Sequence, residues 1–218
     1  MKIIVYDTET TGLPKKSSVP PRIEEESFYP YIVQLSYIMY DTEENKLLKI
    51  YDNVVKIPEN IVISEESIKL HGITREIMDE KGISITDGLK SFLEDANTAE
   101  LIVGHNVSFD NMMIQIEMLR NNFTNLDLFS RSQRFYCTMK NTVELCSIKT
   151  CYKNSTKTYN KFPKLIELYN HLFTLSPTKL HNSLNDVVLC LQCFCKIKFN
   201  VDIAETNAEV KQMIEHIM

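Results

Sequence analysis

Short apolar runs separated by polar turns dominate the first part of the chain and predict β-strands. Residues 2–7 form one such run, typical of a buried strand, and a polar turn is expected at 8–12. Residues 31–40 and 46–57 form two longer runs rich in β-branched and aromatic residues. The polar residues 41–45 between them predict a hairpin turn.

From residue 64 onwards the pattern becomes helical, with one further short strand expected at 100–104. The predicted helices cover 64–70, 74–81, a segment that Thr86 caps and that ends near Asp95, 108–120, 163–173, 183–199 and 203–217. Residues 14–30 contain four prolines and mixed charge, and predict a surface loop. Strands first, then helices alternating with short strands, predict an α/β fold in which helices flank a mixed sheet.

The composition fits one soluble, intracellular domain. The 218 residues are 44% apolar, which suffices for one core without disulfides. The six cysteines show no spacing typical of zinc sites, so reduced, packed thiols are expected, most clearly at Cys190, Cys193 and Cys195. The apolar start is too short for a signal peptide, and no run is long enough to span a membrane. The net charge of −5 argues against coating nucleic acid by bulk charge, but not against nucleic-acid chemistry.

Two acids close the first predicted strand, in the segment Asp-Thr-Glu-Thr-Thr-Gly at 7–12. Asp7 and Glu9 are two positions apart, so on an extended chain both side chains point the same way. A charge at the end of an apolar strand is costly unless it is paired or binds metal. Two carboxylates placed like this form a hard oxygen site suited to Mg²⁺ or Mn²⁺. A solvated turn capped by acids is the alternative.

A second acid-bearing segment, Gly-His-Asn-Val-Ser-Phe-Asp, follows the strand predicted at 100–104. Its acid, Asp110, opens the helix predicted from residue 108. The helix macrodipole alone also favours an acid at such a position, so this segment is a weak signal when taken by itself.

The third segment, His-Asn-Ser-Leu-Asn-Asp, opens the helix predicted at 183–199. Asp186 lies in the first turn of that helix, five residues after His181. Five helical steps rotate by about 140°, so the two side chains cannot share a helix face. We therefore expect His181 in the loop before the helix, with Asn182 or Ser183 as the N-cap.

Together and in this order, the three segments resemble the DEDDh exonucleases, the family of the polymerase III epsilon proofreading subunit. Supporting segments are Tyr-Ile-Val-Gln-Leu from residue 31 and His-Gly-Ile-Thr from residue 71, whereas Cys137 stands where relatives often carry an acid. The resemblance spans residues 1–199 and implies a ribonuclease-H-like fold with a mixed five-stranded sheet flanked by helices. Residues 200–218 are expected to form a C-terminal helical tail packed on or next to this domain.

The resemblance implies a 3′–5′ exonuclease with the catalytic residues Asp7, Glu9, Asp110, His181 and Asp186. The four acids would hold two Mg²⁺ or Mn²⁺ ions, which relieve their mutual repulsion and stabilise the attacking and leaving oxygens. His181 would take a proton from the attacking water, and the products would be nucleoside 5′-monophosphates. The expected substrate is single-stranded or frayed DNA with a free 3′ end. A polymerase or another replication or repair protein is an expected partner.

The resemblance also implies substrate contacts from Thr10, Thr11, Leu13, His71, His105, Asn106 and Phe109. Aromatic and leucine side chains can wedge against unstacked terminal bases. Phe109 fits the hydrophobic core equally well.

A basic stretch at 149–164 stands out in this acidic chain, because it contains five lysines and no acid. The lysines are Lys149, Lys153, Lys157, Lys161 and Lys164, and the interleaved aromatic residues are Tyr152, Tyr159 and Phe162. Lysines with interleaved aromatic rings are typical of segments that bind nucleic-acid strands, although a solvated mobile loop fits equally well. Lys15, Lys16 and Arg22 form a weaker candidate for the same role.

Three alternatives stay open. An RNA-trimming exonuclease or oligoribonuclease would use the same catalytic residues, because the 2′-hydroxyl is recognised by other contacts. A non-catalytic nucleic-acid-binding module would gain by losing repulsive acids, yet all four acids and the histidine are present. If the acids form a structural metal site, the protein should unfold when a chelator removes the metal.

Overall fold

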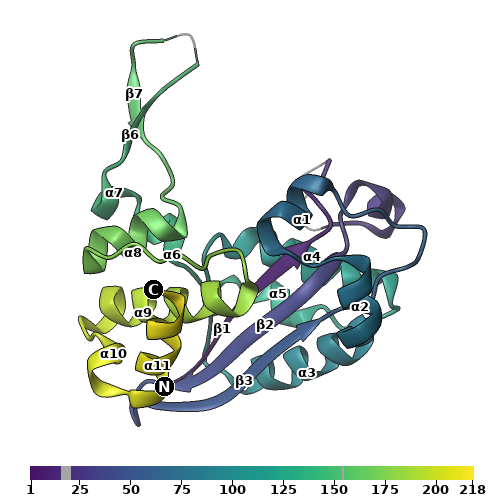
Figure 1. Cartoon of the computed structure of the whole chain (residues 1–218), viewed down its shortest axis with the longest axis horizontal. Helices are drawn as coiled ribbons and strands as arrows, with labels where there is room; N and C mark the ends of the chain where they lie inside the picture. The colour runs from purple at the N-terminus through teal and green to yellow at the C-terminus, as the bar shows by residue number, and fades with distance from the viewer. Residues whose placement is uncertain (16–20, 154) are drawn as a thin grey trace.

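The computed structural model describes residues 1–15, 21–153 and 155–218, and of Ser132 only the backbone. A five-stranded mixed sheet forms its centre, with the strand order β3-β2-β1-β4-β5 (Figure 1). The strands are β1 (Lys2–Thr10), β2 (Ile32–Asp41), β3 (Lys46–Val54), β4 (Leu101–Gly104) and β5 (Phe135–Cys137). β1, β2 and β3 pair antiparallel, whereas β4 pairs parallel with β1 and β5. The expected α/β fold with a mixed five-stranded sheet is confirmed.

The first strand is longer than its apolar run predicts. Thr8 and Glu9 continue the antiparallel register with β2, opposite Leu35 and Gln34, and a bulge precedes Thr10. Backbone pairing with a long neighbouring strand keeps polar residues extended here, so the polar turn expected from residue 8 is wrong. The change matters for the site, because both acids of the first motif lie within a strand.

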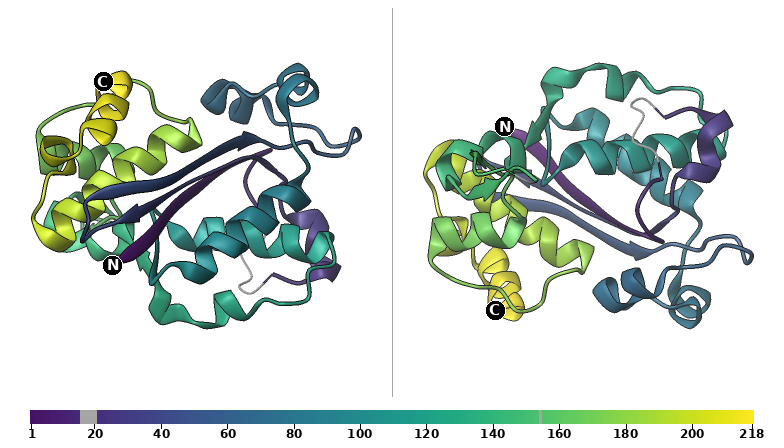
Figure 2. Two further views of the ribbon diagram at one scale, coloured as in Figure 1. Left: turned by 90° about the horizontal axis from the view of Figure 1, so that it is seen from below. Right: turned by 90° about the horizontal axis from the view of Figure 1, so that it is seen from above.

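Two helical layers cover the two faces of the sheet (Figure 2). On one face, α3 (Ile85–Thr98) and α4 (Val107–Arg120) bury a core that includes Tyr6, Tyr37 and Phe92. On the other, α8 (Leu165–Phe173), α9 (Ser183–Phe199) and α11 (Ala208–Ile217) pack over a core that includes Ile3 and Val5. Alternate residues of β1 therefore face different layers, as the period of two in a strand requires.

Short elements connect these layers. They are η1 (Ile23–Phe28), α1 (Glu65–His71), α2 (Arg75–Lys81), α5 (Asp127–Ser130), η2 (Ser132–Arg134), α6 (Thr138–Asn141), α7 (Val143–Cys146), β6 (Lys149–Cys151), β7 (Thr158–Asn160) and α10 (Ile203–Thr206). Ser84, not Thr86, caps α3, because its side chain accepts a hydrogen bond from the Thr86 backbone N–H. Cys190, Cys193 and Cys195 lie buried as free thiols in α9, as expected. Among the described residues, no helix combines the length and apolarity needed to cross a membrane.

The C-terminal residues form two helices where the pattern predicts one. Asn207 separates them, since its side chain accepts hydrogen bonds from the backbone N–H groups of Glu209 and Val210 and so caps α11. α11 buries Val210 and Ile214 against α9 and its neighbours. The helical tail thus shares a hydrophobic core with the sheet.

One arginine ties the loop that contains η1 to α4. The Arg120 guanidinium donates hydrogen bonds to the carbonyl oxygens of Glu26, Tyr29 and Pro30 at 2.8–2.9 Å. It also pairs with the Glu117 carboxylate at 2.8 Å, and both side chains are almost fully buried. A buried carboxylate left without its partner is strongly destabilising.

Replacing Arg120 with methionine is therefore expected to lower the free energy of unfolding by about 3–5 kcal/mol. Urea unfolding followed by circular dichroism measures the change. The double variant Glu117→Gln/Arg120→Met removes both charges but keeps an acceptor for the Ile32 backbone N–H, which donates to Glu117. It should lose less than the single variant. Equal losses in both would show that the carbonyl contacts, not the buried charge, dominate.

Candidate active site

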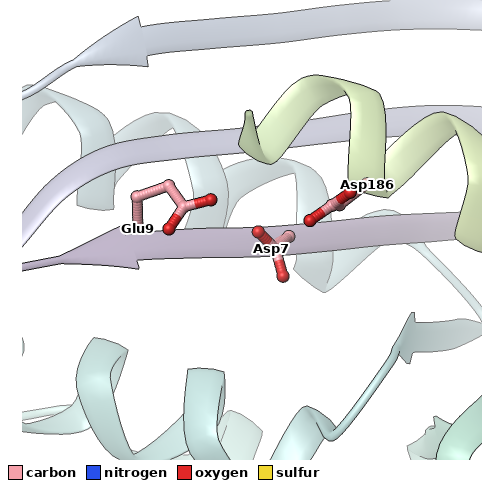
Figure 3. Close-up of side chains that lie close together, drawn as sticks. All are labelled: Asp7, Glu9 and Asp186. Atoms are coloured by element: carbon pink, nitrogen blue, oxygen red, sulfur yellow. The ribbon is translucent and has the colours of Figure 1, made fainter. Parts of the chain in front are cut away.

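The far half of β1 and the start of α9 bring three carboxylates together. Asp7 and Glu9 alternate with Thr8 along β1 and point to the face that α9 covers. Asp186 lies in the first turn of α9, above them. One oxygen from each of the three acids lies within 4.8 Å of the others (Figure 3). The fold therefore joins the first and third motifs into one cluster.

The start of α9 is fastened to the sheet by its own first residues. Asn182 caps the helix, as expected, by accepting a hydrogen bond from a backbone N–H of the first turn. The Ser183 hydroxyl donates to the Asp7 carbonyl oxygen at 2.7 Å, and the Ser183 backbone N–H donates to Gln34 Oε1 at 3.3 Å. These bonds set the height of Asp186 over Asp7.

Ser183 and Gln34 are positioning residues to which the sequence assigned no role at the site. Gln34 and Ser36 are buried polar side chains on β2, and each donates to the Asp52 carboxylate at 2.7 Å. The sequence signal for this hydrogen-bond network is the presence of two polar residues at alternate positions of an otherwise apolar strand. Buried polar groups need hydrogen-bond partners.

Asp110 reaches β1 from the opposite helical layer. β4 pairs with β1 only as far as Val5 and then turns into α4, so the edge of β1 beyond Val5 has no parallel neighbour. Asp110 fills this gap, because its Oδ1 accepts hydrogen bonds from the Thr8 backbone N–H at 3.0 Å and the Thr8 hydroxyl at 2.8 Å. It lies outside the group of three acids, yet its charge is the largest one acting on Asp7.

Crowding and burial shift every acid of this site in the same direction. Burial raises the pKa of Asp7 well above its ordinary value, and the charges of Asp110, Asp186 and Glu9 add to the effect. Burial, with the charges of Asp186 and Asp110, raises the pKa of Glu9 to about 8. Burial also raises the pKa values of Asp110 and Asp186 to about 7. The four carboxyls therefore cannot all ionise at neutral pH without a neighbouring cation.

The donor set fits a hard divalent cation. The Asp186 Oδ1 atom is buried and has no hydrogen-bond partner among the described residues. The three clustered oxygens come from carboxylates alone, the ligand type that Mg²⁺ and Mn²⁺ prefer. A cation there would satisfy the unpartnered oxygen and relieve the repulsion between the acids.

His181 lies in the loop before α9, as its distance from Asp186 along the sequence predicts. It is exposed and its backbone is in the left-handed region, with φ 62°. Its backbone N–H acts on Asp186 and opposes the rise in the pKa of that acid. The imidazole is not part of the carboxylate cluster.

An open cleft of about 500 Å³ leads away from the acid cluster. Its lining residues come from the end of β1 and from α1, with one side chain from α4: Thr8, Glu9, Thr10, Gly12, Leu13, Ser64, Glu66, Ser67, Leu70, His71 and Phe109. Leu13 is 83% exposed and stands at the rim. The carboxylate of Glu9 thus borders a cleft wide enough for a small organic group.

The hydroxyl groups expected to contact substrate are held by the protein backbone. Thr10 Oγ1 donates to the Gly12 carbonyl oxygen at 2.7 Å, and Thr11 Oγ1 accepts from the Tyr31 backbone N–H at 3.0 Å. His71 differs, because its Nδ1 accepts from the Ile73 backbone N–H, while its buried Nε2 forms no hydrogen bond of good geometry with the described residues. Burial lowers the pKa of His71, and the Thr10 backbone opposes this shift. The ring lines the cleft.

His105 is held by hydrogen bonds from both ring nitrogens to the protein. Its Nε2 lies 3.0 Å from the Pro163 carbonyl oxygen and must carry the proton, so Nδ1 accepts from the Thr138 hydroxyl at 2.9 Å. Burial lowers the pKa of His105 to about 4. The ring therefore links the end of β4 to the segment before α8, and its expected contact with substrate stays a prediction.

The remaining predicted contacts lie at the start of α4 and in the loop before η1. Asn106 is exposed at the N-cap of α4, with φ 68° and no capping bond from its side chain. Phe109 packs against the core and also lines the cleft, so both of its expected roles are compatible with its position. Lys15 lines a separate hollow next to η1, and Lys16 lies outside the described residues.

A family model described as exonuclease, RNase T, matches residues 4–194. The chain belongs to this exonuclease family. The match covers the three acidic motifs, the cleft and both positioning residues, Gln34 on β2 and Ser183 at the start of α9. The RNase T family assignment makes the protein a nuclease, and the expected resemblance to DEDD exonucleases is confirmed.

Solved structures share the fold at low sequence identity. Zinc-bound E. coli exonuclease I in complex with single-stranded DNA is 14% identical, with a TM-score of 0.65 over 90% of this chain and 41% of that one. Exonuclease I from Methylocaldum szegediense is 15% identical, with a TM-score of 0.60 over 95% and 43%. Cell-death related nuclease 4 is 15% identical, with a TM-score of 0.59 over 90% and 64%. The chain thus spans less than half of the exonuclease I chains, and no curated protein matches its sequence.

Replacing Glu9 with glutamine is expected to stabilise the metal-free nuclease. The pKa of Glu9 is raised from 4.5 to about 8, so the folded state holds this proton more tightly than the unfolded chain. The free energy of unfolding must then fall as pH rises between those two values. In EDTA at the upper end of this range, Glu9→Gln should raise the melting temperature by about 2–4 °C for each kcal/mol of repulsion removed.

The measurement is thermal unfolding in EDTA across this pH range. Glu94→Gln is the matched control, because Glu94 is exposed on α3. If the Glu9 variant kept the wild-type pH dependence, the acid cluster would not be the source of the instability.

Proposed function

We propose that this nuclease is a metal-dependent 3′–5′ exonuclease that releases nucleoside 5′-monophosphates from single-stranded or frayed DNA. The observation that carries the proposal is the convergence of Asp7, Glu9 and Asp186, with Asp110 beside them, next to an open cleft that Glu9 lines. A cluster of half-buried acids lowers the stability of the fold, and such a cluster is useful where charge develops in a transition state.

The proposed cofactors are two divalent cations held by the four acids. Asp7, Glu9 and Asp186 would share one, and Asp7 with Asp110 would border the second. Bound there, the cations would stabilise the attacking and leaving oxygens of a phosphodiester. The family generally uses divalent metals, and E. coli exonuclease I has been described with zinc bound. We propose Mg²⁺ or Mn²⁺ for this chain, because its ligands are carboxylates without a thiol or imidazole.

His181 is the proposed general base. It stands on the loop before α9, exposed and outside the carboxylate cluster, so its ring can accept a proton from water without joining the metal ligands. The hydrogen bonds of Ser183 that fix the start of α9 also fix the point from which this loop approaches the site.

The cleft would take the terminal nucleotide. Leu13 and Phe109 offer apolar surface to the base, and the His71 ring borders the same cleft. The single-stranded DNA in the exonuclease I complex supports a single strand as the substrate class.

The proposal predicts that hydrolysis needs Mg²⁺ or Mn²⁺ and stops in EDTA. A single strand labelled at its 5′ end should shorten in a ladder, whereas a label at the 3′ end should appear at once as a mononucleotide. Matched RNA strands and blunt duplexes in the same assay define the preferred substrate. Asp186→Asn should remain folded and lose nearly all turnover, and Asp87→Asn on α3 is the matched control. Activity in excess chelator, or release from the 5′ end, would overturn the proposal.

Removing the base should slow chemistry without weakening metal binding. His181→Ala is expected to lower the single-turnover rate by a factor of about 10²–10⁴. A lost proton acceptor acts only in the transition state, so the affinity for substrate should change far less. The rates are measured against pH for both proteins, with Mg²⁺ affinity determined separately, and His216→Ala is the matched control. Parallel loss of metal binding and rate would make His181 a ligand or a structural residue.

A further inference from the structure

The basic stretch at 149–164 folds into an arm that stands away from the body of the molecule. β6 and β7 pair antiparallel, with Thr150 opposite Tyr159. Figure 1 shows this two-stranded arm projecting beyond α7 and α8, away from the sheet and both helical layers. Here "the arm" means residues 149–153 and 155–160. A projecting hairpin that adds nothing to the core calls for another role.

One face of the arm carries two exposed aromatic rings. Tyr152 and Tyr159 contact each other diagonally across the two strands, with ring centroids 4.5 Å apart. They are 54% and 40% exposed. Lys157 pairs with Tyr152, since the Tyr152 N–H donates to its carbonyl oxygen, and its side chain therefore shares their face. Such a face offers stacking surface beside a cation.

The arm carries positive charge with no acid to neutralise it. Lys149, Lys153 and Lys157 are exposed and form no ion pair within the described part of the chain. Lys161 is different, because it pairs with Glu167 at 2.5 Å where the arm joins α8. In a chain of net charge −5, three uncompensated lysines on one projection form a local site for an anion.

The base of the arm is fixed to the end of β4, which is followed by α4. His105, one residue after β4, links its Nε2 to the carbonyl oxygen of Pro163 at 3.0 Å. The Asn160 side chain donates to Glu144 on α7 at 2.9 Å. The arm therefore keeps a set origin relative to α4, which carries Asp110.

From these features we infer that the arm is a second binding site for single-stranded nucleic acid. It holds the part of the substrate strand that has not yet reached the acid cluster, by phosphate contacts from Lys149, Lys153 and Lys157 and by stacking of an unpaired base on Tyr152 and Tyr159. The inference rests on the proposed function, because it takes the substrate to be a nucleic acid.

The exposed rings distinguish a single strand from a duplex. Lysines alone would attract either, because both carry phosphates. Stacking on a protein ring requires a base that is not already stacked inside a helix, and each such contact contributes ~1–3 kcal/mol to binding. An acidic polypeptide would satisfy the lysines but leave the rings without a planar partner.

The test measures binding in EDTA, so that its outcome is independent of hydrolysis. Fluorescence anisotropy with labelled strands of ~16 nucleotides and ~4 nucleotides, both within the range of known single-strand sites, is recorded over a series of salt concentrations. The variant Lys149→Gln/Lys153→Gln/Lys157→Gln should bind the long strand more weakly. Its log–log salt slope should be smaller by about two, since each lost phosphate contact contributes ~0.7. Binding of the short strand should stay unchanged.

The matched control is Lys46→Gln/Lys90→Gln/Lys211→Gln, which removes the same charge from β3, α3 and α11. Equal weakening in both triple variants would reduce the effect to net charge and overturn the inference. Unchanged binding of the long strand by the arm variant would overturn it as well. All variants should keep the wild-type melting temperature, because every substituted side chain is exposed.

A second variant separates stacking from charge. Tyr152→Ala should raise the Kd for the long single strand about fivefold or more and leave the Kd for a blunt duplex unchanged, while Tyr152→Phe should restore single-strand binding. Equal loss for single strand and duplex would exclude stacking on an unpaired base. Polyglutamate is tested in the same assay. If it bound the wild type as tightly as the single strand does, and if the arm variant lost this binding, the partner of the arm would be an acidic protein instead. A nuclease that fails to hydrolyse DNA but passes these binding tests would refute the proposed function alone.

Discussion

Repulsion between half-buried carboxylates that lie side by side is the constraint on which this structure depends. A strand that is apolar from Ile3 to Tyr6 places Asp7 and Glu9 at the edge of the core, and α9 brings Asp186 over them. Burial and mutual charge raise the pKa values of all three acids and of Asp110. Without a cation the acid cluster lowers the stability of the fold, so it forms only if the surrounding structure fixes the acids in place. The sheet does so.

The positions at which the strands end determine where the acids are fixed. Because β4 stops pairing at Val5, the Thr8 N–H is left free and becomes the anchor of Asp110. On the other face, Ser183 binds the Asp7 carbonyl and so sets α9 on the same strand. Acids from two opposite helical layers thus converge on a few residues of β1, a juxtaposition that either layer alone could not achieve.

The sequence predicts features that depend on local pattern, and fails where distant contacts decide. The hairpin strands and the cap at Asn182 follow from apolar runs and polar punctuation, and both are confirmed. The extension of β1 through Thr8 depends on pairing with β2, and β5 is a three-residue strand too short to give a periodic signal. The bond of His105 to Pro163 spans 58 positions, so its motif indicates a site but not which atoms are already occupied.

Local sequence pattern also does not show which lysines of the basic stretch are paired with acids. Composition identifies five lysines there, but only the fold separates Lys161, which is neutralised by Glu167 where the arm joins α8, from the three uncompensated lysines on the arm. On the proposed function, the acid cluster repels a polyanion until cations bind, and the net charge of the chain is also negative. Cationic contacts are then most effective on a projection away from the acids, because the repulsion between exposed charges is screened over a distance of about 10 Å. On this proposal, the arm attracts the strand and the acid cluster hydrolyses it.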